Sequence, residues 1–146
     1  MGFQFPLQRL LTYKESIEEK KKERLADLQD RRRVLEEELS ETQSQYKICS
    51  SKNPKAKVNI LQFGHQLAYM EYLDHVIDEQ TVAVEKASCN VDRCRKEVVE
   101  AMRDRKVIEK LKFKQEATYY NELERKELIE LNEIALNKYL KENNHK

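Results

Sequence analysis

The sequence predicts an all-α fold, an antiparallel two-helix coiled-coil hairpin in which the second helix is longer and overhangs the first. Charged residues make up 38% of the 146 residues and there are only two Gly and two Pro, a composition typical of long helices. An apolar row repeats every seven residues from Phe63 to Val98. A polar stretch with a proline, residues 50–57, separates that row from an earlier periodic segment and marks a turn.

The first helix is expected over about residues 6–49, because Pro6 suits the first helical position. The main apolar rows of this segment contain Leu7, Leu11, Leu25, Leu28, Leu35, Leu39 and Tyr46. Leu10 and Ile17 lie on a neighbouring row. The charged run 18–24, between the two patterns, therefore predicts a register adjustment in the first helix.

The second helix is expected over about residues 59–142, after a turn over about 50–58. Two starts remain open: Asn53 as an N-cap before Pro54, or Asn59 as an N-cap with Gln62 completing a capping box. One row of the seam holds Phe63, Met70, Ile77, Val84, Val91 and Val98, and the other holds Gln66, Leu73, Gln80, Ala87, Cys94, Ala101 and Ile108. An average spacing of 3.5 residues keeps such a stripe facing one partner helix.

A short connection makes two helices antiparallel neighbours, so residues 1–146 are expected to form a single coiled-coil hairpin. The seam weakens at Arg105, Lys112 and Gln115. In an antiparallel hairpin this is about where the first helix has no further residues to pair with the second. By helical rise, about 35 residues of the second helix are then left without an internal partner. Such a helix is marginal in water by itself. It is expected to dock into another protein, with pairing in a homodimer as the alternative.

The overhang also changes charge along its length. Residues 103–114 hold six basic and two acidic residues, a net charge of +4, whereas residues 116–142 hold four basic and seven acidic residues, a net charge of −3. Aromatic residues gather instead near the turn: Phe63, Tyr46, Tyr69 and Tyr72. They form either a partner surface or a cap over the end of the hairpin, and the sequence leaves both open.

Several function classes are disfavoured. The chain has no Gly-rich phosphate loop, nucleophile elbow, HExxH or CxxC motif, and its three cysteines lack the spacing of a metal site. We therefore expect no catalytic, cofactor-binding or metal-binding residues and no enzymatic activity. A net charge of +1 disfavours nucleic acid as a partner. No apolar run approaches the roughly 18 residues of a membrane span, so we expect a cytoplasmic protein without membrane insertion.

Three segments carry a family resemblance. Residues 3–15, FQFPLQRLLTYKE, resemble the opening of the FliJ family of flagellar type III export chaperones. Residues 103–112, RDRKVIEKLK, resemble the basic segment of that family, and residues 130–135, ELNEIA, are similar to its closing motif. The three segments occur in the family's order and span nearly the whole chain. Gly64, near the start of the second helix, departs from the family pattern.

The resemblance implies a role in flagellum biogenesis, chemotaxis and protein transport. FliJ-family proteins resemble the central stalk of rotary ATPases, are held at the centre of the hexameric export ATPase FliI, contact the cytoplasmic domain of the export gate protein FlhA, and escort export chaperones. The resemblance thus implies a coupling protein that is peripheral to the cell membrane through the export apparatus. The alternative is a homodimeric coiled-coil scaffold or chaperone of another secretion system.

Two groups of residues are expected to bind these partners. The group at the terminal end, for the ATPase, contains Leu7, Leu11, Arg103, Arg105, Lys106 and Lys110. The group at the hairpin tip, for the export gate, contains Leu39, Tyr46, Tyr69 and Leu73.

Overall fold

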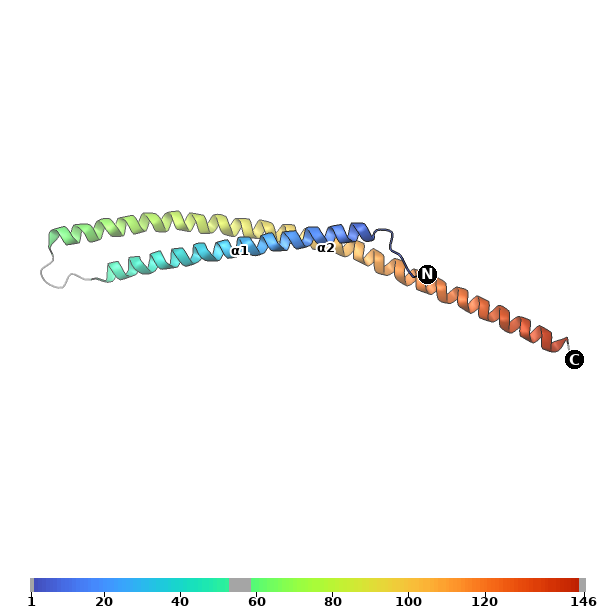
Figure 1. The fold of residues 1–146 in the computed structure, drawn as a ribbon. Helices are drawn as coiled ribbons and strands as arrows, with labels where there is room; N and C mark the ends of the chain where they lie inside the picture. The colour runs from blue at the N-terminus through green and yellow to red at the C-terminus, as the bar shows by residue number, and fades with distance from the viewer. Residues whose placement is uncertain (1, 53–58, 145–146) are drawn as a thin grey trace. The chain divides into compact units, whose positions relative to one another are not determined.

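The computed structural model describes residues 2–52 and 59–144 and contains two α-helices, α1 (Gln8–Ser51) and α2 (Ile60–Asn143) (Figure 1). The helices have 44 and 84 residues, and the described residues contain no strand. The all-α fold class and the two packed helices with a longer second helix are confirmed. α1 begins at Gln8 rather than at Pro6, which lies in a turn whose Phe5 carbonyl accepts a hydrogen bond from the Gln8 N–H.

The chain forms two compact units. We call residues 18–100 the hairpin unit, and residues 1–17 together with 101–146 the terminal unit. Each unit contains part of α1 and part of α2. The expectation that the whole chain behaves as one domain stays a prediction.

In the hairpin unit α1 and α2 pack antiparallel, side by side (Figure 1). Near the turn, the Gln66 side-chain amide donates a hydrogen bond to the Cys49 carbonyl at 2.7 Å. Farther along, the Cys94 thiol lies 3.8 Å from the Lys21 carbonyl oxygen. The first contact joins the end of α1 to the start of α2, and the second joins an early part of α1 to a later part of α2. The helices therefore run in opposite directions.

The predicted seam of α2 is the core of the hairpin unit. Every residue of its two rows from Gln66 to Val98 is buried or half-buried, and Val91 is 0% exposed. Cys94 is buried in this seam, as a small apolar residue would be. Phe63 was predicted to join the seam and is exposed instead. Because α1 ends at Ser51 and the Gln66 side chain already reaches the Cys49 and Lys52 carbonyls, no turn of α1 remains opposite Phe63.

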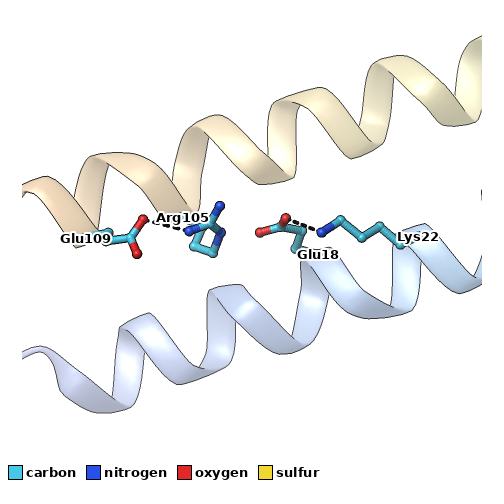
Figure 2. Close-up of polar contacts among 4 residues, drawn as sticks. All are labelled: Glu18, Lys22, Arg105 and Glu109. Atoms are coloured by element: carbon cyan, nitrogen blue, oxygen red, sulfur yellow. Dashed lines mark hydrogen bonds and ion pairs between the residues drawn. The ribbon is translucent and has the colours of Figure 1, made fainter.

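The predicted register adjustment in α1 is wrong. The seven-residue row of Leu25 and Leu39 continues through Glu18, Arg32 and Tyr46, and all five residues are buried or half-buried. The seven-residue spacing continues without interruption, because polar side chains fill the positions of the row where apolar residues are missing. Glu18 lies almost fully buried on α1 and forms an ion pair with Lys22 at 2.8 Å, one helical turn away (Figure 2).

Asn59 caps the start of α2. Its side-chain oxygen accepts a hydrogen bond from the Leu61 N–H at 3.3 Å, and its carbonyl accepts one from the Phe63 N–H at 3.1 Å. Asparagine at this position satisfies an N–H group that the first helical turn leaves without a partner. The described part of the chain therefore favours the Asn59 start. The alternative at Asn53 lies outside the described residues.

In the terminal unit, α1 and α2 are again antiparallel. Lys14 forms an ion pair with Asp104 at 3.5 Å, and Lys112 donates a hydrogen bond to the Gln8 side-chain oxygen at 2.9 Å. The seam rows continue with Ala101, which is buried, and Ile108, which is half-buried. Two polar cross-helix contacts thus flank a thin apolar core in this unit.

The residues before α1 extend the pairing of α2 farther than its seam predicts. Phe5 is buried, and the ring of Phe3 lies 5.7 Å from that of Tyr119. Half-buried positions on α2 consequently continue to Tyr119 rather than ending near Ile108. The overhang is therefore shorter than predicted, and it begins at Tyr120, because the non-helical segment 2–7, which precedes α1, covers a further part of α2.

The hairpin seam contains a polar atom whose removal should stabilise the protein. The Gln80 side-chain oxygen is buried and has no hydrogen-bond partner among residues 2–52 and 59–144, a state that costs about 1–3 kcal/mol. Gln80→Leu should raise the free energy of unfolding by about that amount, measured by urea unfolding followed by circular dichroism. Gln66→Leu is the matched control, since the Gln66 amide is hydrogen-bonded and its loss brings no such gain. Equal effects of the two substitutions would contradict this account.

Candidate functional site

The last part of α2 is exposed to solvent on all sides. Every described residue from Tyr120 to Asn144 is exposed, over a helical length of about 36 Å to Asn143. We call residues 120–144 the bare segment. Its exposed large apolar and aromatic residues are Tyr120, Leu123, Leu128, Ile129, Leu131, Ile134, Leu136, Tyr139 and Leu140. A stretch with this much apolar surface is typical of a protein-binding segment.

The apolar residues of the bare segment are not confined to one stripe. Successive residues of an α-helix are about 100° apart, so Leu131 and Leu136 lie about 140° apart around the axis. By the same arithmetic the nine residues cover roughly three quarters of the circumference. A helix that pairs with one other helix needs a single narrow stripe, whereas a helix that is apolar on most sides is enclosed by its surroundings. The distribution favours a partner that surrounds this segment.

One shallow groove on the bare segment shows the chemistry of this surface. It is lined by Glu127, Glu130, Leu131 and Ile134. Leu131 and Ile134 are each 64% exposed, and no ion pair engages the two carboxylates within the described part of the chain. The groove suits a partner side chain that has an apolar body and a cationic end.

The two leucines predicted to bind at the terminal end lie in different surroundings. Leu7 is exposed just before α1, where its carbonyl accepts a hydrogen bond from the Leu11 N–H at 3.0 Å. Leu11 is buried in the terminal unit. Leu7 is thus available for direct contact, and Leu11 supports the packing beneath it.

The four predicted cations of the terminal end divide similarly. Arg103, Lys106 and Lys110 are exposed. Arg105 is half-buried and its guanidinium forms a 2.7 Å ion pair with Glu109, one turn along α2 (Figure 2). The first three lie on the outer surface of α2, and Arg105 belongs to its packed face.

At the hairpin tip the structure brings Tyr69 together with Tyr72, another of the aromatic residues expected near the turn. Their rings stack with centroids 6.5 Å apart, and both side chains are exposed, Tyr72 by 61%. Leu39 and Tyr46 are half-buried and Leu73 is buried. The exposed surface at this end includes the tyrosine pair and further apolar residues of the adjoining helix turns: Ile48, Ile60, Leu61, Phe63 and Leu67.

Sequence reasoning missed three aromatic residues that shape the terminal unit. Phe3, Phe5 and Tyr119 extend the covered part of α2, and the Tyr119 ring also packs edge-on against Tyr120 at 5.5 Å. A signal was available, because Tyr119 falls on the seven-residue row that runs from Val98 through Arg105 and Lys112. The polar residues on that row concealed its continuation.

Residues 2–52 and 59–144 contain no group of His, Cys, Asp or Glu that is arranged to hold a metal ion. Within the same ranges, neither helix contains a stretch that is sufficiently apolar over a sufficient length to span a membrane. His75 lies 3.4 Å from Glu79 on the exposed face of α2.

Comparison with known proteins relates the chain to a protein family. The model of the family described as "Flagellar FliJ protein" matches residues 3–144. No curated protein and no solved structure matches the chain significantly. The match covers both helices and the non-helical segment before α1.

Proposed function

Because the chain belongs to the FliJ family and is thereby related to flagellar protein export, we propose that it is a stalk that couples the hexameric export ATPase FliI to the export gate protein FlhA. In this role it has no catalytic activity of its own and acts by contact. It is peripheral to the cell membrane through the export apparatus, where it also escorts export chaperones.

The bare segment is the observation that carries this proposal. A hexameric ATPase with a central opening surrounds whatever enters that opening, and the apolar residues of the bare segment cover most sides of α2. A single helix is about 10–12 Å wide with its side chains, which a narrow channel can accommodate. The homodimer alternative needs a continuous apolar stripe along one face, and residues 120–144 carry none.

The hairpin tip supports the second half of the proposal. Exposed tyrosines in stacked contact are typical anchors of protein interfaces, since they supply a large contact area with few rotatable bonds. Tyr69 and Tyr72 belong to the hairpin unit, whereas the bare segment belongs to the terminal unit. The chain therefore has two separate candidate contact surfaces, as a coupling protein requires.

The direct test is to add the full chain to its cognate FliI and to measure hexamer formation by light scattering and ATP hydrolysis by phosphate release. The proposal predicts that both increase in a saturable manner. If neither changes at chain concentrations well above micromolar, the stalk function is wrong.

For the gate contact, we predict that Tyr69→Ala together with Tyr72→Ala weakens binding to the FlhA cytoplasmic domain by about tenfold or more, measured by calorimetry. Both tyrosines are exposed, so helicity should be unchanged. Tyr13→Ala is the matched control, since Tyr13 is exposed on α1 in the terminal unit. If the Tyr69/Tyr72 variant binds FlhA with wild-type affinity, the hairpin tip is not part of the gate interface.

A further inference from the structure

Four cations line one outer face of α2 in the terminal unit. Arg103, Lys106, Lys110 and Lys114 follow each other at spacings of three and four residues, which place them on one side of the helix. All four are exposed. We call them the basic stripe.

The basic stripe is not neutralised by the acidic residues of its own stretch. Within residues 103–114 the two acidic residues pair with other cations: Asp104 with Lys14 and Glu109 with Arg105. Among the residues that the structure describes, no ion pair involves any member of the basic stripe. Like charges four residues apart, as at Lys106, Lys110 and Lys114, destabilise a helix. Such a stripe is suited to an external anion.

Two large apolar side chains share this face with the cations. Val107 is 68% exposed and Phe113 is 61% exposed, although the opposite face of the same helical stretch is packed. A cationic surface with projecting apolar groups fits three kinds of partner: an acidic protein surface with apolar recesses, an anionic membrane, or a nucleic acid.

The charge beyond the stripe separates these partners. Residues 116–142 of the same helix carry a net charge of −3. The groove of the bare segment places Glu127 and Glu130 beside exposed leucine and isoleucine. Membranes and nucleic acids are negative along their whole surface, so they would repel this continuation of α2. A protein can match both signs at successive levels.

From these observations we propose that the basic stripe docks on an acidic zone, with apolar pockets, of the partner protein, and that this protein surrounds α2. The next zone of the same partner along the helix faces residues 116–142 and is neutral or basic. Reversed insertion would bring like charges together, so the charge change fixes the direction in which α2 enters. The inference rests on the proposed ATPase contact and specifies the partner's chemistry there.

The test compares two triple variants of the full chain in binding to cognate FliI over a range of salt concentrations. The first is Lys106→Gln, Lys110→Gln and Lys114→Gln. The matched control is Lys86→Gln, Arg93→Gln and Lys96→Gln, which removes three exposed cations from α2 in the hairpin unit. We expect the stripe variant to lose about tenfold or more in affinity at low salt and to show a shallower salt dependence. The control should behave as wild type.

The alternative partners are tested with vesicles of mixed neutral and anionic lipid and with duplex DNA. Stripe-dependent binding to either would overturn the proposal in favour of that partner. If wild type binds FliI and both variants match it at every salt concentration, the acidic zone is wrong and the stalk function stands. If wild type does not bind FliI at all, the stalk function is wrong and the proposed zone is rejected with it.

Discussion

The variant Leu131→Gln with Ile134→Gln should abolish activation of the export ATPase without unfolding the chain. Both side chains are 64% exposed and line the groove of the bare segment. Fully burying a large aliphatic side chain contributes about 1.5–3 kcal/mol, so the double variant, which loses two of them, should bind FliI about 100-fold more weakly or worse. Glutamine is a good helix former, and helicity should remain. Phosphate release and circular dichroism measure the two effects.

The matched control is Val82→Gln with Val99→Gln, which replaces two exposed apolar residues of α2 in the hairpin unit. It should activate FliI as the wild type does. Equal loss of activation in both variants would show that activation of FliI depends on apolar surface along α2 in general and not on the bare segment in particular. Unchanged activation by the Leu131/Ile134 variant would mean that the bare segment is not the ATPase contact.

The largest expected effect on stability comes from Val91→Asp. Val91 is fully buried in the seam of the hairpin unit, where a carboxylate would lose its hydration. We expect the free energy of unfolding to fall by at least about 3 kcal/mol, with loss of helical circular dichroism at a much lower temperature.

Val82→Asp serves as the comparison, because Val82 lies on the same helix in the same unit and is exposed. Its substitution should change stability by less than about 0.5–1 kcal/mol. Similar destabilisation by both would contradict the assignment of the seam, since burial is the property that separates the two valines.

The seam was predictable from the sequence because its physical cause is local. A seven-residue apolar repeat brings the same side of a helix to its partner at every second turn, and the spacing alone identifies Met70, Val84 and Cys94 as seam residues. Its polar members were harder to assign. Glu18 and Arg32 occupy seam positions that a search for apolar residues does not find, which produced the wrong register adjustment.

A seven-residue repeat could not predict the contacts that α2 makes with non-helical residues. The packing of Phe3 on Tyr119 depends on how the non-helical segment before α1 runs, and no repeat encodes that path. The exposure of Phe63 depends on the residue at which α1 ends. For the candidate site, the sequence predicted Arg103, Lys106, Lys110 and Tyr69, and the structure shows that these four residues are exposed. The sequence could not show that Leu11 and Leu73, predicted for the same surfaces, are buried. A seven-residue row shows which side of a helix packs against its partner, but it does not show how deeply each side chain is buried.

In the proposed stalk function, the bare segment of α2 becomes enclosed by the export ATPase. Hydrogen exchange of the backbone amides of residues 120–144, measured in the free chain and in the presence of FliI, tests it most directly. In the free chain this segment is a single helix without tertiary contacts, so its amides should exchange rapidly. Bound to FliI, they should become strongly protected, together with the amides around the basic stripe. Protection confined to the hairpin unit, with residues 120–144 still exchanging as in the free chain, would contradict the claim.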